Sequence, residues 1–224
     1  MKTWTVVIPI YNDEKSLVVL LEEIKKLEFH DGLFLIVDNG STNKLSLQPD
    51  GDKIPGVDLV RTELNLGFGG GIKFGLNKAE TEWVGWMPGN LKVHPRELFL
   101  LRPIIRSNNF DFIKANRKGR SFLANFKTFG VGLIQSLILR RMMFDTGGTP
   151  TFIKKSLLYV LEDAPDDYVF ESYVLFKARR FKMRIKRPKV NYGNRIFGHS
   201  HWQRGMKAEF NLLINIVRQS KKWK

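Results

Sequence analysis

Apolar positions in the first part of the chain fall into short unbroken runs, separated by segments of helical spacing or turn residues. The runs cover residues 3–10, 33–37, 57–60 and 83–86, and they are rich in β-branched and aromatic side chains. Such runs are typical of strands that are buried on both faces of a parallel sheet. The pattern therefore predicts four buried strands.

Helical spacing appears between these runs. Asn12 or Asp13 can cap a first helix, and a second helix is expected over residues 72–78. The apolar positions of the first helix are Leu17, Leu20, Leu21, Ile24 and Leu27. Because strands and helices alternate, we predict the α/β class, with a doubly wound, mostly parallel sheet.

The second half has a less regular pattern. We expect one helix around residues 128–139, another over 168–178, and a closing amphipathic helix over 206–217 that leads into a lysine-rich end. Between residues 180 and 185 the period changes to two, which predicts a half-exposed strand with a basic face. The helix around residues 128–139 is predicted from the apolar positions Phe129, Leu133, Ile134, Leu137 and Ile138. The closing helix is predicted from the apolar positions Met206, Phe210, Leu213, Ile214 and Val217.

Charge divides the chain into two unlike parts. Residues 1–110 carry 13 Lys and Arg against 14 Asp and Glu, whereas residues 111–224 carry 24 against 8. The whole net charge of +15 therefore arises in the second half. This asymmetry indicates an anionic partner for that half, such as a phosphorylated substrate, a phospholipid surface or a nucleic acid.

Composition narrows the class of protein. Cysteine is absent, so disulfides and thiolate metal sites are excluded, which suits a reducing compartment. The N-terminal residues lack the apolar core of a signal peptide. The longest uncharged apolar stretch, residues 128–139, is shorter than the roughly 20 residues that a spanning helix needs. We expect a soluble or peripheral protein.

The run at 83–86 leads directly into the polar stretch Met87-Pro88-Gly89-Asn90-Leu91-Lys92. Ligands of open α/β sheets bind at the carboxyl ends of the strands, so we expect the chemistry of this protein at this stretch. The glycine-rich Gly67–Gly71 fits neither the dinucleotide fingerprint nor a P-loop, which needs Gly-Lys-Ser/Thr. From these residues alone, a turn before a helix is favoured there.

Six motifs together resemble those of family 2 glycosyltransferases, and they extend over most of residues 3–202. The first three match the nucleotide-binding half: Pro9-Ile10-Tyr11-Asn12-Asp13, Val37-Asp38-Asn39-Gly40-Ser41-Thr42 and Asn65-Leu66-Gly67. The others look like the dolichyl-phosphate mannosyltransferase branch: Asp145-Thr146-Gly147-Gly148, Tyr168-Val169-Phe170-Glu171 and Arg195-Ile196-Phe197-Gly198-His199-Ser200. The resemblance implies a single GT-A domain, with a nucleotide-sugar-binding half at 1–110 and an acceptor-binding, membrane-facing half at 111–224.

The same resemblance assigns roles to individual residues. Pro9, Tyr11, Asp13 and Gly67 would line the donor nucleotide, and Asp38 would accept hydrogen bonds from its base. Asp38 also suits an ordinary turn, since Asp-Asn-Gly-Ser is good turn chemistry. Basic and polar positions that would hold phosphates or the acceptor are Arg117, Lys127, Arg195 and Ser200.

The central stretch departs from the family pattern. The family has Asp-x-Asp there to hold Mg²⁺ or Mn²⁺, but this chain has Pro88, Gly89 and Asn90, followed by Lys92. Hard divalent cations favour carboxylate oxygens, so metal binding through Asn90 should be weak. Either Lys92 replaces the ion against the donor's diphosphate, or it is a solvent-facing loop residue.

The expected function is transfer of a sugar, with inversion, from a GDP- or UDP-sugar to a polyprenyl phosphate at the cytoplasmic face of a membrane. A phosphate acceptor needs no general base. A sugar hydroxyl would need one, with Asp145 or the pair Asp166 and Asp167 as candidates. Two alternatives remain: a catalytically impaired relative that only binds nucleotide sugars, and, less favoured, a nucleic-acid-binding protein, since residues 177–189 hold eight basic residues.

Overall fold

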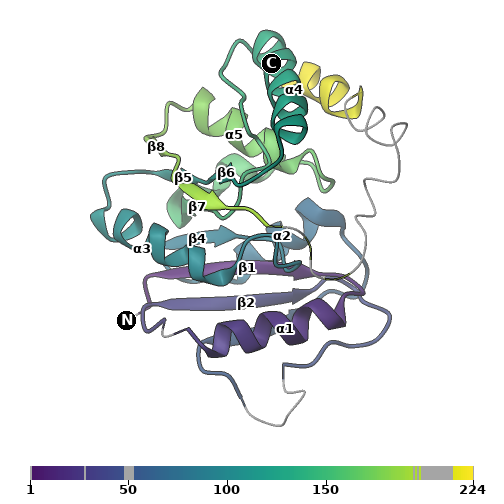
Figure 1. Cartoon of the computed structure of the whole chain (residues 1–224), viewed down its shortest axis with the longest axis vertical. Coiled ribbons are helices and arrows are strands. Elements are labelled where there is room, and N and C mark those ends of the chain that lie inside the picture. The colour runs from purple at the N-terminus through teal and green to yellow at the C-terminus, as the bar shows by residue number, and fades with distance from the viewer. Residues whose placement is uncertain are drawn as a thin grey trace.

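The computed structural model describes residues 2–27, 29–47, 53–193, 195, 197 and 214–223. A seven-stranded sheet forms its centre, with the strand order β3-β2-β1-β4-β7-β5-β8, and helices cover both faces (Figure 1). The strands are β1 (Trp4–Ile10), β2 (Gly32–Asp38), β3 (Val57–Arg61), β4 (Trp83–Trp86), β5 (Phe112–Lys114), β6 (Asn116–Lys118), β7 (Thr151–Lys154), β8 (Ile185–Lys186) and β9 (Lys189–Asn191). The helices are α1 (Glu14–Lys25), α2 (Gly67–Lys78), α3 (Leu98–Ser107), α4 (Phe122–Leu139) and α5 (Phe170–Arg180), with 3₁₀ turns η1 (Pro95–Glu97), η2 (Lys155–Leu161) and η3 (Lys221–Trp223).

The predicted α/β class and mostly parallel sheet are confirmed. Strands β3, β2, β1 and β4 run parallel, and β7 is antiparallel to both of its neighbours, β4 and β5. The short strands β6 and β9 pair separately. The second half of the chain therefore adds β7, β5 and β8 to the sheet that the first half begins.

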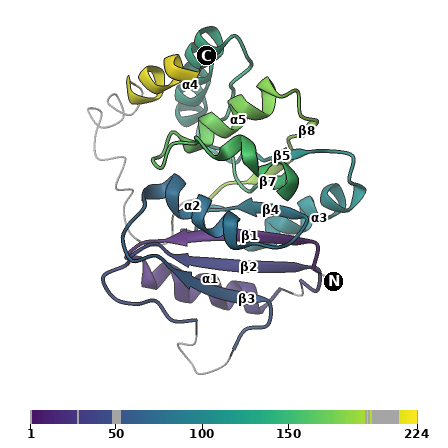
Figure 2. The ribbon, with the colours of Figure 1, turned by 180° about the vertical axis from the view of Figure 1, so that it is seen from behind.

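Two apolar layers enclose the sheet. Helices α1 and α3 pack on one face, against side chains of β1 and β2 that include Ile8 and Ile36. Helices α2 and α5 pack on the other face, against Val7, Val37 and Trp86, and Figure 2 shows this side with α2 in front. Successive residues of β1 thus enter opposite layers, which explains why the run at 3–10 is apolar throughout.

Helix α2 begins earlier than the predicted 72–78, because the glycine-rich segment is itself helical. Its first-turn N–H groups are satisfied from a distant loop: Gly69 and Gly70 both donate to the carbonyl of Asp166, over 2.7 and 3.2 Å. A Cβ atom at Gly69 would lie 2.2 Å from the carbonyl oxygen of Pro165. The glycines are therefore required for close packing between α2 and the loop before α5.

The predicted strand at residues 180–185 was wrong over most of its length. Helix α5 continues to Arg180, and the N–H of Phe181 still donates to Lys177 over 2.9 Å. Lys182 then takes a left-handed conformation, with φ of 53°. Only Ile185 and Lys186 join the sheet. The alternation of basic and apolar residues reflects the end of a helix and a turn.

Helix α4 also differs from its prediction. Ser121 caps its first turn by accepting from the N–H of Ala124 over 3.3 Å, so the helix begins upstream of the uncharged stretch and extends to 18 residues. By length and composition alone it is long and apolar enough to cross a membrane. The expectation that this segment is too short for a span was therefore wrong, because Lys127 does not interrupt the helix.

The closing helix is described only from residue 214. Residues 214–220 are helical and lead into η3, whereas the predicted positions Met206, Phe210 and Leu213 lie outside the described residues. Gln219 donates to Asp167 over 2.8 Å, and the ring of Trp223 meets Tyr173 edge-on at 5.2 Å. These contacts hold the end of the chain against α5, beside α4 (Figure 1).

Candidate functional site

The carboxyl ends of β1 and β2 lie side by side in register, and their loops are linked by hydrogen bonds. The N–H of Asn12 donates to Ser41 Oγ over 3.0 Å, and the N–H of Thr42 donates to Asn12 Oδ1 over 2.8 Å. Asn12 has a φ of 48°, a conformation that Asn tolerates better than most residues. The first two sequence motifs therefore form one structural unit.

A cavity of about 290 Å³ opens between these two loops. Asn12, Glu14, Ser41, Thr42, Asn43 and Leu45 line it. Of the predicted donor residues, Tyr11 is exposed beside this unit and Pro9 is half-buried. Asp13 accepts a weak hydrogen bond from the N–H of Ser16 over 3.4 Å and so caps α1. Contact of these residues with a nucleotide stays a prediction, and the structure adds Asn43 and Glu14 as neighbours.

Asp38 is the most constrained of the predicted donor residues, with only 1% of its surface exposed. Its carboxylate accepts from the N–H of Ser41 over 2.9 Å and of Leu45 over 3.2 Å, and it forms an ion pair with Arg61. Burial acts to raise the pKa of Asp38, but the Ser41, Leu45 and Arg61 donors outweigh it and the pKa is lowered. Asp38 therefore organises the loop after β2, and its contact with a base stays a prediction.

The third motif is joined to the second by Asn39. Its side-chain amide donates to the carbonyl of Gly67 over 2.9 Å, and its Oδ1 accepts from the N–H of Leu66 over 3.2 Å. The N–H groups of Gly67, Gly69 and Gly70 are occupied by Asn65 and Asp166, so these three groups are not available to a phosphate. Gly67 has a packing role, because a Cβ atom there would lie 2.5 Å from the carbonyl oxygen of Asp166, and its contact with a nucleotide stays a prediction. The expected turn before a helix was wrong for this segment, because Gly67–Gly71 forms the start of α2.

The central stretch follows β4 at the same edge of the sheet. Asn90 Oδ1 accepts from the N–H of Lys92 over 3.2 Å, so the amide oxygen offered to a metal is used within its own turn. In the part of the chain that the structure describes, no group of three or more His, Asp or Glu side chains is arranged to hold a metal ion. The donor set at Pro88, Gly89 and Asn90 does not fit a divalent cation.

A cluster of basic side chains occupies this place instead. The side chain of Lys92 is half-buried, and burial, followed by the charges of Arg195, Arg117 and Arg120, lowers the pKa of its ammonium. The carbonyl of Lys92 accepts from the N–H of Gly193 over 2.8 Å. We call Lys92, Arg117, Arg120 and Arg195 the cation cluster. It draws on the loop after β4, the segment around β6 and the segment after β9.

Two predicted residues of the second half, Arg117 and Asp145, form one unit. Arg117 Nε donates to Asp145 Oδ1 over 2.6 Å, and the backbone N–H of Arg117 donates to Oδ2 over 2.8 Å. Burial acts to raise the pKa of Asp145, but Arg117 outweighs it and the pKa is lowered. A carboxylate with a lowered pKa is a weak general base, so this geometry favours Asp145 as a positioning residue for Arg117.

Two tyrosines stand beside the cluster. The guanidinium of Arg117 lies over the ring of Tyr192, 5.5 Å from its centroid, and burial raises the pKa of Tyr192 to about 12. Burial likewise raises the pKa of Tyr168, although the charges of Arg117, Arg120 and Arg195 oppose the shift. Both phenols therefore remain neutral hydrogen-bond donors at neutral pH.

The other candidate bases are also engaged in structural contacts. Asp166 pairs with Lys73 over 2.8 Å. Asp167 accepts from Asn215 and Gln219 in the closing helix, over 3.2 and 2.8 Å. Each of the three carboxylates proposed as a base is thus tied to a cation or to amide groups.

Two predicted site residues remain, Lys127 and Ser200. Lys127 is exposed on α4, next to Thr128, whose hydroxyl accepts from Arg120 of the cation cluster over 2.9 Å. Contact of Lys127 with a phosphate stays a prediction. Ser200 lies outside the described residues. Sequence reasoning missed Arg120 and Tyr192, because a single arginine after a short strand and a single tyrosine carry no motif. The only available signal was their place in a strongly basic half.

A family model described as glycosyl transferase family 2 matches residues 5–153. Undecaprenyl-phosphate 4-deoxy-4-formamido-L-arabinose transferase of Proteus mirabilis (strain HI4320) is 24% identical over 219 residues, covering 95% of this chain and 65% of that protein. The transferase of the same name from Serratia proteamaculans (strain 568) is 22% identical over 223 residues, covering 97% and 67%. The chain thus spans about two thirds of the length of these curated relatives.

Solved structures of glucosyl-3-phosphoglycerate synthase from Mycobacterium tuberculosis have a similar fold. The complex with Mn²⁺, UDP and glucosyl-3-phosphoglycerate gives a TM-score of 0.69 at 17% identity, covering 98% of this chain and 78% of that chain. The complex with UDP alone gives 0.70 at 16% identity, with coverages of 99% and 80%. At this level of identity the likeness is one of fold.

Proposed function

The chain belongs to glycosyl transferase family 2 and is therefore a glycosyltransferase, and from this premise we propose that it transfers a sugar from a nucleotide diphosphate sugar to a polyprenyl phosphate. The donor, a GDP- or UDP-sugar, would place its nucleoside in the cavity between the loops after β1 and β2. Its diphosphate would extend toward Lys92 at the end of β4. The names of the two transferases that this chain resembles support undecaprenyl phosphate as the kind of acceptor.

The observation that carries the proposal is the cation cluster at the carboxyl edge of the sheet. The reaction brings together a diphosphate and an acceptor phosphate, and such a concentration of anions needs cationic partners in a partly buried site. The cluster provides four cationic groups, of which Arg117 is already paired with Asp145.

The proposed step needs no base. An oxygen of the acceptor phosphate is already anionic at neutral pH, so it can attack the anomeric carbon as the bond from that carbon to the diphosphate oxygen breaks. The nucleoside diphosphate leaves from the opposite face with the bonding electron pair, which inverts the configuration. This fits a site in which Asp145, Asp166 and Asp167 already serve other partners.

We further propose that this chain holds the diphosphate without Mg²⁺ or Mn²⁺. The related fold of the M. tuberculosis synthase is recorded with Mn²⁺ and UDP, but here Asn90 and its neighbours do not fit that ion. Lys92 would supply the positive charge at that place, assisted by Arg120 and Arg195.

The acceptor half would work at the cytoplasmic face of a membrane, to which the protein binds as a peripheral protein. Its basic excess suits an anionic leaflet. Two alternatives remain. The absence of the Asp-x-Asp carboxylates would fit an impaired relative that binds nucleotide sugars without turnover. Transfer to a sugar hydroxyl would instead need one of the three aspartates as a base.

The test is a transfer assay with the purified chain, undecaprenyl phosphate in detergent and a panel of UDP- and GDP-sugars, with EDTA or Mn²⁺. We expect release of nucleoside diphosphate together with a new glycolipid, unchanged by EDTA. Calorimetry with the same donors identifies the binding-only relative, which would bind a donor without release. Product formed only with a saccharide acceptor would contradict the phosphate acceptor.

A further inference from the structure

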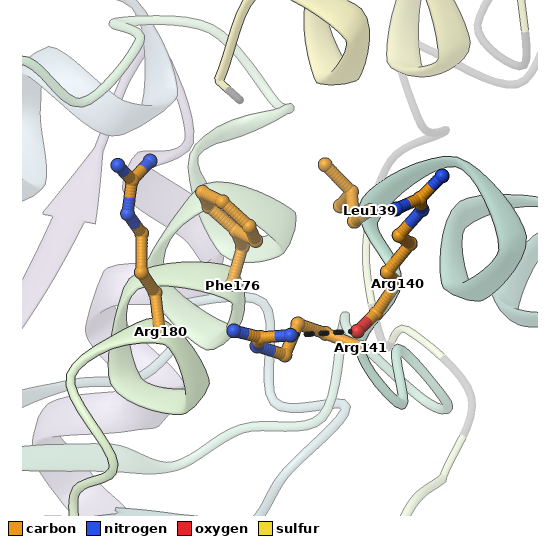
Figure 3. A pocket seen from close by; sticks show the side chains of 5 residues that line it. All are labelled: Leu139, Arg140, Arg141, Phe176 and Arg180. Carbon is orange, nitrogen blue, oxygen red and sulfur yellow. Dashed lines mark hydrogen bonds between the residues drawn. The ribbon is translucent and has the colours of Figure 1, made fainter.

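A second basic site lies away from the cation cluster, where α4 and α5 end. A cavity of about 520 Å³ opens there, lined by Leu139, Arg140, Arg141, Phe176 and Arg180. Figure 3 shows Arg140 and Arg180 on opposite sides of this cavity, with Phe176 and Arg141 between them. We call it the arginine pocket.

The arginines of this pocket keep most of their hydrogen-bonding capacity. Arg141 donates to the carbonyl of Arg140 over 2.9 Å, and Arg180 donates to the carbonyl of Trp223 over 2.8 Å. Within the residues described, none of the three forms an ion pair with a carboxylate. Guanidinium groups bind phosphate oxygens through paired N–H groups. Leu139 and Phe176 line the pocket from largely buried positions, and the guanidinium of Arg180 lies over the ring of Phe176, 5.9 Å from its centroid. The pocket therefore suits a phosphate group.

Helix α4 presents an exposed apolar stripe next to this pocket, in which Phe129 also stacks on the ring of Phe144 at 5.3 Å. Phe122, Phe126, Phe129, Leu133 and Leu137 follow one another at intervals of three or four residues, which places them on one face of the helix. They are exposed, with Phe122 at 85%, Phe126 at 65% and Leu137 at 72% of their surface. Such a stripe is unusual on a protein surface in water.

The opposite face of α4 is anchored, so the outward direction of the stripe is fixed. Gly132, Gln135 and Leu139 are buried, and Gln135 donates to Ser220 in the closing helix over 3.3 Å. A Cβ atom at Gly132 would lie 3.0 Å from the carbonyl oxygen of Met143. The second half of α4 thus packs closely on the protein through one face and presents the apolar stripe on the other.

We infer that the arginine pocket binds the phosphate of an anionic phospholipid head group, while the outward stripe of α4 enters the acyl region beside it. An amphipathic helix in the interface buries its apolar face among acyl chains, and nearby basic residues strengthen its binding to anionic lipids. Charge complementarity selects this occupant over a second copy of the chain, because two copies would each bring a net charge of +15.

This inference rests on the proposed function, in which the acceptor is a polyprenyl phosphate in a membrane, and it adds a second lipid contact. The acceptor phosphate would enter the cation cluster, whereas the arginine pocket would hold bulk lipid and fix the protein's orientation. Its test measures lipid binding and not turnover, so the two proposals can fail separately.

The experiment is co-sedimentation of the full chain with phosphatidylcholine vesicles that contain phosphatidylglycerol, and with pure phosphatidylcholine vesicles. The pocket variant is Arg140→Gly/Arg141→Gln/Arg180→Gln. Arg140 is the left-handed residue after α4, with φ of 51°, where helices favour glycine. The glutamine at 180 retains a donor for the carbonyl of Trp223. The fold should therefore persist, which circular dichroism checks.

The matched control removes the same charge from exposed positions at the far end of the sheet, with Lys2→Gln/Lys25→Gln/Lys53→Gln. We expect the pocket variant to lose about 100-fold in affinity for the anionic vesicles, at about five-fold for each arginine. The control should lose little. Equal losses of affinity in both variants would show that net charge alone causes the effect. That result would overturn lipid binding by the arginine pocket.

Three further measurements address the apolar stripe and the other occupants. Phe126→Gln/Leu133→Gln should weaken vesicle binding at high salt, where the electrostatic part is screened; unchanged binding would remove the stripe from the interface. Soluble glycerol phosphate should compete poorly with vesicles, and full competition would identify a free-phosphate site instead. Mass photometry should show no dimer whose dissociation follows these substitutions, since such a dimer would identify a second copy as the occupant.

Discussion

The guanidinium of Arg117 is fixed by the carboxylate of Asp145, which also accepts from the backbone N–H of the same arginine. Asp145 in turn has a left-handed backbone, with φ of 46°, and its carbonyl accepts from Arg187 over 2.8 Å. The arginine is thus held at the side chain and at the main chain. This rigidity suits a group that must meet a phosphate at a defined place.

Asp145→Asn should therefore act on substrate binding. Loss of a hydrogen bond to a charged group costs about 1.5–3 kcal/mol, so KM for the phosphate substrates should rise about ten-fold or more, with a smaller change in kcat. Steady-state kinetics measures both. A general base would behave differently: kcat would fall by about 10²–10⁴-fold with KM retained, and the acid limb of the pH–rate profile would disappear.

Acid stability gives a second measurement on the same pair. The pKa of Asp145 is lower in the folded chain than in the unfolded chain, so its contribution to stability is fully present above the unfolded value, near 4. It is lost as the pH falls through the folded value. The free energy of unfolding of the wild type should thus decline below about pH 4, and Asp145→Asn should flatten part of that decline in urea titrations.

Donor binding should persist in EDTA if Lys92 replaces the metal. Lys92→Ala should then weaken UDP- or GDP-sugar binding about ten-fold or more, because a diphosphate loses a charged partner, while Asn90→Ala should cost less and Lys92→Arg should retain binding. Calorimetry measures all three variants. Loss of donor binding in EDTA, with recovery in Mn²⁺, would show that a metal ion holds the diphosphate and that Lys92 has no role in binding it.

The pH dependence of this binding has a defined sign. Burial and the neighbouring arginines lower the pKa of Lys92, whereas a bound diphosphate would raise it. Affinity should therefore fall as the pH rises through the pKa of the free protein. Lys92→Arg should remove this alkaline decline, since a guanidinium stays protonated.

Asp38 has two roles to separate. Asp38→Ala removes an acceptor of two backbone N–H groups and the partner of Arg61, so it should lower the free energy of unfolding by about 1–3 kcal/mol as well as the nucleotide affinity. Arg61→Ala is the matched variant, because it disturbs the same loop without removing the carboxylate. If both variants weaken nucleotide binding equally, Asp38 acts through the loop alone.

The glycines of α2 offer a test of packing. Gly69→Ala places a methyl group against the carbonyl of Pro165 and the Cβ of Phe170, which should destabilise the protein by about 1–3 kcal/mol. Gly130→Ala is the control, because a Cβ atom there has nothing within 4 Å. That substitution should stabilise α4 by up to about 1 kcal/mol. Urea denaturation measures both, and a neutral Gly69→Ala would contradict the close contact.

Periodicity predicted the elements whose neighbours are local. The four runs of the first half became β1 to β4, and Asp13 caps the first helix as its residue type suggested. These outcomes depend on spacing and on hydrogen bonds within a few residues, which a sequence carries explicitly. The resemblance of six motifs to family 2 glycosyltransferases predicted the family and the GT-A fold. The family match and the similar solved structures confirm both predictions.

Tertiary contacts decided the remaining features, because their partners lie far apart along the chain. The start of α2 depends on Asp166, almost a hundred residues later, and the state of Asp38 depends on Arg61. Whether Lys92 faces solvent or joins a cluster depends on arginines that follow β6 and β9. A single lysine has the same sequence signal in either place, since burial and neighbouring charge belong to the fold. The sequence therefore determined which groups are available for chemistry, and the folded chain determined which of them meet.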